Sequence, residues 1–276
     1  MANCIATTAG RWLVCIRCWA MPAKRCVLDE MPVWQAANTT KRTDVPAIVG
    51  VSAPGFAPME ALSKTAMDAG AAGVMIAPTS NLRNDDQIIN YYHNVAETVG
   101  EAPWVLQDFP LVTSVTIPTK VILKIVEDCP TCVMLKHEDW PGLEKISALR
   151  AASDAGARRI SILCGNGALF LVEEMLRGAD GAMTGFAYPE MMVSVVEHYN
   201  RGDVERGQDI FNAYLPLARF EQQPGMGLAI RKYILAKRGV IAHDALRKPG
   251  AGLSKESRVE VDRLIARQEK RLKELG

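Results

Sequence analysis

Residues 131–136 place a lysine at the end of an apolar run. The segment reads Thr-Cys-Val-Met-Leu-Lys, and its nearly continuous apolar character predicts a strand that is buried on both faces. Burial disfavours the charged form of a lysine, so more of the side chain is the free amine that attacks a ketone. Lys136 is therefore a candidate Schiff-base nucleophile. A structural lysine in a salt bridge would give the same local pattern.

The elements around Lys136 alternate between two kinds of segment. Short apolar runs predict strands at residues 46–51, 73–77, 104–107, 132–136, 159–164 and 181–184. Amphipathic segments predict helices at residues 58–69, 85–99, 118–128, 140–155, 167–177 and 189–201. This alternation favours parallel strands with crossover helices, in a closed (β/α)8 TIM barrel or a doubly wound sheet. No GxGxxG fingerprint follows a strand, which disfavours a nucleotide-dependent oxidoreductase.

The last part of the chain has no strand pattern. Helical spacing predicts helices at residues 203–221, 225–238 and 255–275. We therefore expect a barrel over residues 1–202 and a C-terminal helical extension over residues 203–276. Lys, Arg and Glu alternate over residues 267–274, which indicates a solvated helix face.

Composition narrows the class of partner. The chain has 276 residues, 49% of them hydrophobic, and a formal net charge of +1, so it offers no basic field for nucleic acid. No apolar run approaches the length of a membrane span. The seven cysteines show no spacing typical of a disulfide framework, so we expect reduced thiols and predict a cytoplasmic protein. The histidines show no i, i+4 pair, so we predict no catalytic metal. A small-molecule partner is expected.

The residues around Lys136 resemble a known family. Residues 133–140, Val-Met-Leu-Lys-His-Glu-Asp-Trp, resemble the strand and turn that carry the Schiff-base lysine in the dihydrodipicolinate synthase and N-acetylneuraminate lyase family. Further segments match in family order over residues 45–240. They are residues 46–51, 68–74, 104–110, 163–167 and 178–183.

The resemblance implies a fold and an activity. The fold is an eight-stranded barrel with a C-terminal helical extension, usually in a homotetramer, with a dimer as the other oligomer that we consider. The activity is that of a class I lyase, an aldolase or a dehydratase, in which Lys136 condenses with pyruvate or a related 2-oxo acid and no cofactor is needed. The protonated imine then acts as an electron sink. Gly165 and Met183 match positions that line the family's substrate pocket, and both are also ordinary turn and core residues.

The chain departs from the family at the proton relay. The family's Tyr-Asn-x-Pro signature reads Gln-Asp-Phe-Pro at residues 107–110. An amide exchanges no proton near neutral pH, so Gln107 would position a substrate or water. Asp108 is the nearest titratable substitute; its structural alternatives are a loop cap and the partner of a basic residue.

A second departure concerns the substrate. Dihydrodipicolinate synthases carry an arginine just after that proline, whereas this chain reads Leu-Val-Thr at residues 111–113. We therefore do not expect a true dihydrodipicolinate synthase. The alternative function is a noncatalytic barrel that binds a small molecule, or a degenerate relative.

The first 44 residues match the family poorly. A barrel requires two strands before residue 46, yet only residues 12–19 read as one, and the family's carboxylate-binding Gly-x-x-Gly-Glu turn has no counterpart. Residues 18–25 can be back-translated and read in a shifted frame that starts at the third base of the codon for residue 18. This frame gives Leu-Gly-x-Ala, followed by positions that permit Gly, then Glu, then Ala or Thr. We hypothesise that residues up to 44 carry a frameshift, which the nucleotide sequence would decide.

Overall fold

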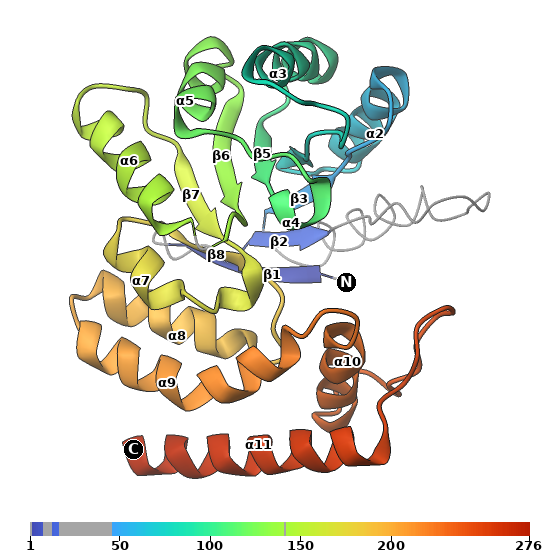
Figure 1. Cartoon of the computed structure of the whole chain (residues 1–276), viewed down its shortest axis with the longest axis vertical. Helices are drawn as coiled ribbons and strands as arrows, with labels where there is room; N and C mark the ends of the chain where they lie inside the picture. The colour runs from blue at the N-terminus through green and yellow to red at the C-terminus, as the bar shows by residue number, and fades with distance from the viewer. Residues whose placement is uncertain (1, 8–12, 17–45, 141) are drawn as a thin grey trace. The chain divides into compact units, whose positions relative to one another are not determined.

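The computed structural model describes residues 2–7, 13–16, 46–140 and 142–276 (Figure 1). The chain divides into two compact units. Unit 1 comprises Met1–Gly165 and Glu173–Met183, and unit 2 comprises Asn166–Val172 and Thr184–Gly276. The division after residue 202 stays a prediction.

The strands follow one another in chain order around a closed barrel. In the part of the chain that the structure describes, they are β1 (Ala2–Thr7), β2 (Leu13–Ile16), β3 (Ala47–Gly50), β4 (Gly73–Ile76), β5 (Trp104–Asp108), β6 (Cys132–His137), β7 (Ser161–Cys164) and β8 (Gly181–Thr184). Strands β2 to β8 pair in parallel. The six strands predicted from residue 46 onward are confirmed within two residues at each end.

The two strands that a barrel requires before residue 46 are present, but they do not pair as expected. β1 and β2 are antiparallel, whereas a (β/α)8 barrel predicts parallel neighbours. Only residues 8–12 separate them, and a parallel connection needs about a dozen residues or more. The frameshift hypothesis concerns residues that lie mostly outside the described ranges, and it stays a hypothesis.

Helices alternate with the parallel strands, and a helical group ends the chain. They are α2 (Phe56–Asp68), α3 (Asp85–Val99), α4 (Pro110–Thr113), α5 (Thr119–Asp128), α6 (Leu143–Asp154), the 3-10 turn η1 (Asn166–Ala168), α7 (Leu171–Leu176), α8 (Pro189–Asn200), α9 (Val204–Glu221), α10 (Gly227–Lys237) and α11 (Lys255–Leu275). In unit 1, α2, α3, α5 and α6 contact one another in chain order. In unit 2, α9 contacts α8, α10 and α11.

Local chemistry explains where the helices begin. The Asn84 side chain accepts a hydrogen bond from the backbone N–H of Gln87, which caps α3 at the predicted residue. Gly142 has a φ of +53°, so α6 begins at Leu143 and not at residue 140 as predicted. Positive φ at residues 166–168 likewise divides the predicted helix 167–177 into η1 and α7, because an α-helix requires negative φ.

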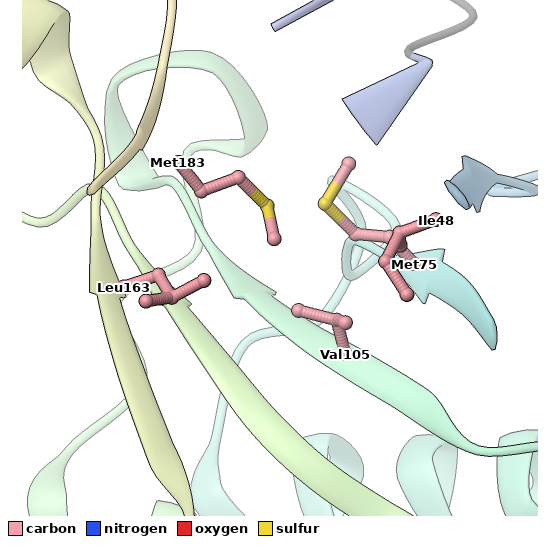
Figure 2. Close-up of a cluster of buried hydrophobic side chains, with 5 residues drawn as sticks. All are labelled: Ile48, Met75, Val105, Leu163 and Met183. Carbon is pink, nitrogen blue, oxygen red and sulfur yellow. The ribbon is translucent and has the colours of Figure 1, made fainter. Parts of the chain in front are cut away.

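Apolar side chains from neighbouring strands form a layer inside unit 1. Figure 2 shows Ile48, Met75, Val105, Leu163 and Met183 converging, and Met134 of β6 packs against them. Side chains alternate between the two faces of a strand. The next position on the same face, toward the carboxyl end, is therefore residue 107 on β5, 136 on β6 and 165 after β7. The apolar layer is a floor beneath these positions.

Candidate functional site

The side chain of Lys136 ends beside a carboxylate. Its Nζ lies 3.0 Å from Oε1 of Glu138, and both side chains are buried, with 1% of Lys136 exposed. Lys136 stands in β6 opposite Gln107 of β5 and Leu163 of β7. The ammonium and the carboxylate have therefore both left water, where each is costly to hold as an isolated charge.

Two of the predicted residues hold Glu138 in this position. Gln107 Nε2 donates a hydrogen bond to Glu138 Oε1 over 2.5 Å. A Cβ atom on Gly165 would lie 2.2 Å from Glu138 Cγ, so only glycine leaves room for this side chain. The structure thus brings Lys136, Gln107 and Gly165 together around a fourth residue.

Glu138 was not among the predicted site residues. The signal was its spacing, because a residue two positions after Lys136 lies on the same face if the strand continues. The backbone N–H of Glu138 donates to the carbonyl of Asp108 over 2.8 Å, which extends the β5–β6 pairing by one step. Sequence reasoning ended the strand at Lys136 and therefore left Glu138 in the turn.

Asp108 belongs to a different cluster. Its Oδ2 lies 2.7 Å from Nζ of Lys145 on α6 and 3.7 Å from Nδ1 of His137, and Lys145 also contacts Asp139. Asp108 and His137 follow Gln107 and Lys136, so alternation directs them to the opposite face. The structure does not bring Asp108 together with Lys136, and it matches the expectation of a basic partner.

A buried acid lies on this outer face as well. The Cys164 thiol hydrogen-bonds to Glu174, and both side chains are buried. Desolvation raises the pKa of Glu174 to about 7, against a smaller lowering by His137. Burial also raises the pKa of the Cys164 thiol well above its usual value. Cys164 and Glu174 therefore form a buried polar pair on the outer face of β7.

Met183 of β8 belongs to the apolar cluster shown in Figure 2. Its predicted role in lining a substrate pocket stays a prediction.

The described ranges contain a second pair of cysteines, Cys129 and Cys132. Cys129 and Cys132 are free and buried, and burial raises the pKa of Cys132 to about 12, so this pair has little thiolate for redox chemistry. Among the described residues, no group of side chains is placed to hold a metal ion. Within the same ranges, no helix combines the length and apolarity that crossing a membrane requires. The cytoplasmic location stays a prediction.

Comparison with known proteins identifies the family. Residues 27–268 match the Dihydrodipicolinate synthetase family. The chain belongs to this family. Its members are class I aldolases and dehydratases, so the expected enzyme class is confirmed, and the family binds pyruvate and related 2-oxo acids.

Three relatives of this dihydrodipicolinate synthetase family protein illustrate the range of similarity. The crystal structure of dihydrodipicolinate synthase from Rhodopseudomonas palustris is 53% identical with a TM-score of 0.84, covering 87% of this chain and 80% of that one. L-2-keto-3-deoxyarabonate dehydratase from Azospirillum brasilense is 26% identical over 79% of this chain and 70% of its own. YagE from Escherichia coli K12, whose structure was solved in complex with pyruvate, is 18% identical with a TM-score of 0.77, covering 88% of this chain and 81% of that one.

These comparisons confirm the predicted fold. The solved relatives share the barrel and the C-terminal helices. The family match begins at residue 27, so residues 27–44, which we expected to match poorly, lie within it. The oligomeric state stays a prediction.

Proposed function

We propose that this protein is a Schiff-base lyase, an aldolase or a dehydratase, in which Lys136 condenses with pyruvate or a related 2-oxo acid and Glu138 transfers the protons. The observation that carries the proposal is the 3.0 Å contact between Lys136 Nζ and Glu138 Oε1 in a buried site. A nucleophilic amine needs a group that takes its proton, and this carboxylate lies within hydrogen-bond reach.

The first steps follow from burial. A proton passes from the Lys136 ammonium to Glu138, which converts a buried ion pair into two neutral groups and removes the cost of desolvating both charges. The free amine attacks the ketone carbon, and Glu138 returns the proton to the oxygen. Loss of that oxygen as water leaves a protonated imine on Nζ.

The imine then withdraws electrons from the adjacent carbon. In an aldolase, the adjacent carbon–carbon bond breaks and its electron pair moves to the imine nitrogen. In a dehydratase, a base removes a proton from the adjacent carbon and the C–H electron pair moves to the imine nitrogen; the resulting enamine then returns these electrons and expels the hydroxyl group of the next carbon, which takes a proton and leaves as water. Glu138 is again the nearest acid or base to the reacting atoms. Water finally attacks the imine, which releases the product and restores Lys136. Gln107, whose amide N–H donates to Glu138, orients the carboxylate for both transfers.

We propose a substrate other than that of a true dihydrodipicolinate synthase. Gln107 occupies the position of the family's relay tyrosine, and residues 111–113 supply no arginine for a second carboxylate. The name of the Azospirillum relative, a dehydratase of a deoxy sugar acid, supports a hydroxylated 2-oxo acid. The Rhodopseudomonas relative carries the synthase name, so the two substrates need to be assayed side by side.

The second candidate is a barrel that binds a 2-oxo acid without turnover. The altered relay at residues 107–110 favours it. A binding protein would hold pyruvate reversibly and would form no covalent bond with Lys136.

Reduction with borohydride distinguishes these candidates. We expect the full chain, incubated with pyruvate and borohydride, to carry a reduced adduct that peptide mass spectrometry locates at Lys136. Lys136→Met, which removes the amine and keeps an unbranched chain, should abolish it. Lys145 is a matched internal control because it is also a carboxylate-paired lysine with little exposure. An adduct at Lys145, or none in folded protein, would refute the Schiff-base proposal.

A further inference from the structure

The segment that follows Lys136 is closed by a hydrogen bond from a buried imidazole. β6 ends at His137, Glu138 follows, and α6 begins at Leu143. His137 Nε2 lies 3.0 Å from the carbonyl oxygen of Gly142. A carbonyl oxygen only accepts hydrogen bonds, so Nε2 carries a proton and donates. The imidazole therefore joins the two ends of the turn that carries Glu138.

The turn accepts only glycine at residue 142. The φ of Gly142 is +53°, a conformation that residues with a side chain rarely adopt. A Cβ atom at this position would lie 2.3 Å from His137 Nε2, so any other residue would displace the imidazole. The close approach of Gly142 to the ring is thus a specific feature of this turn.

The other ring nitrogen of His137 makes no hydrogen bond. Nδ1 is buried without a hydrogen-bond partner in the described ranges, and it lies 3.7 Å from Oδ2 of Asp108, which is too long for a hydrogen bond. A buried polar atom without a partner costs free energy. Alternation along β6 directs His137 and Lys136 to opposite faces. The hydrogen bond of this ring therefore serves the turn and not the amine.

The backbone around Glu138 shows what the turn holds. The N–H of Glu138 donates to the carbonyl of Asp108 over 2.8 Å, and the carbonyl of His137 accepts from the N–H of Gly165 over 2.8 Å. The register of β6 with both neighbouring strands ends at His137. Past this point, the hydrogen bond from His137 to Gly142 restrains the far end of the turn.

We propose that His137 is a positioning residue for proton transfer. Its hydrogen bond fixes the turn, so that Glu138 Oε1 stays within reach of Lys136 Nζ. The inference rests on the proposed function, in which Glu138 transfers the protons. The two atoms are 3.0 Å apart, and a displacement of about 1 Å can slow a reaction by about 10²-fold. His137 acts through the turn and not on the reacting atoms.

Two substitutions of His137 separate its hydrogen bond from its volume. The amide nitrogen of glutamine reaches about as far as Nε2, whereas that of asparagine falls one bond short of the Gly142 carbonyl. With pyruvate and borohydride, we expect His137→Asn in the full chain to slow adduct formation at saturating pyruvate at least tenfold. The pyruvate concentration that gives half the maximal rate should not change. His137→Gln should retain most of the wild-type rate, and equal rates in the two variants would overturn the inference.

A double variant tests whether His137 acts through Glu138. If it does, His137→Asn should slow the wild type but add little to Glu138→Gln. Equal slowing in both backgrounds would indicate a general structural effect and would overturn the inference. The proposed function fails on different results, namely no adduct in wild type or an unchanged rate in Glu138→Gln, and this inference would fall with it.

Gly142→Ala tests the same contact with the imidazole retained. Its Cβ would displace Nε2, so we expect adduct formation to slow at least tenfold. Gly100→Ala is the matched control, because Gly100 has a φ of +58° and a Cβ there would meet nothing within 4 Å. Circular dichroism checks that each variant is folded. A wild-type rate in folded Gly142→Ala protein, or equal slowing in Gly100→Ala, would overturn the inference.

Discussion

At the scale of single residues, the proposed mechanism gives Glu138 the proton transfers that a phenol performs in the family. Gln107 cannot exchange a proton, but its amide N–H contacts the carboxylate that can. In this proposal the acid–base group lies at the end of β6 and not in β5, while the nucleophile keeps its position in β6. One carboxylate beside Lys136 would then serve both imine formation and the later proton transfers.

Replacing Glu138 with glutamine tests this assignment. Glu138→Gln keeps the size and the hydrogen bonds but removes the transferable proton, so we expect pyruvate adduct formation to slow by about 10²-fold or more. The measurement is the rate of borohydride-trapped adduct by mass spectrometry. Asp139→Asn is the control, because Asp139 contacts Lys145 and not Lys136. Equal rates for wild type and Glu138→Gln would remove Glu138 from the mechanism.

Gly165 tests the position of the same carboxylate. In Gly165→Ala, the added Cβ would lie 2.2 Å from Glu138 Cγ, so Glu138 must move. We expect a loss of about 1–3 kcal/mol in the free energy of unfolding from this overpacking, together with slower adduct formation. Urea unfolding measures the first effect. Gly252→Ala, where a Cβ would meet nothing within 4 Å, should change neither quantity.

At the scale of elements, the sequence predicted most strands and helices, because burial on both faces leaves a distinct apolar run. It predicted least well where backbone conformation overrides side-chain pattern. The φ of +53° at Gly142 moves the start of α6 to Leu143. The four-residue helix α4 is too short to show a helical period. Glu138 was missed for a related reason. Its pairing with β5 through the Asp108 carbonyl depends on the neighbouring strand and not on local sequence.

The packing of Glu174 against β7 predicts a pH-dependent stability. Desolvation raises the pKa of Glu174 from 4.5 to about 7, so the folded state holds a proton that the unfolded state loses at lower pH. The resulting stabilisation is complete below pH 4.5 and is lost as pH rises through 7, with a change of about 3 kcal/mol. We expect Glu174→Gln to remove this dependence, measured by urea unfolding at pH 5.5 and 8.5. Glu144→Gln, at an exposed position, should retain the wild-type slope.

At the scale of the whole molecule, the family of the chain and the way in which its barrel is completed depend on different parts of the sequence. The alternation from residue 46 onward and the segment around Lys136 were sufficient to identify the barrel family. Neither could establish how the chain before residue 46 completes the barrel. That depends on how the strands pair. β1 and β2 are antiparallel, because the short connection over residues 8–12 does not allow the parallel arrangement that a barrel predicts.

The effect of pyruvate on the Tm of the full chain tests whether the chain forms a working site. A ligand that binds only the folded state stabilises it by about 2.7 kcal/mol at a hundred times its Kd. For a chain of this size, that corresponds to a rise in Tm of about 5–10 °C. We expect pyruvate to produce such a rise in calorimetric scans of the full chain, and propionate, which has no ketone, to produce little. In Lys136→Met the pyruvate effect should fall to that of propionate, because the imine supplies most of the binding. An equal shift in Lys136→Met would favour the noncatalytic barrel, and no shift in wild type would mean that the chain does not complete its carboxylate site.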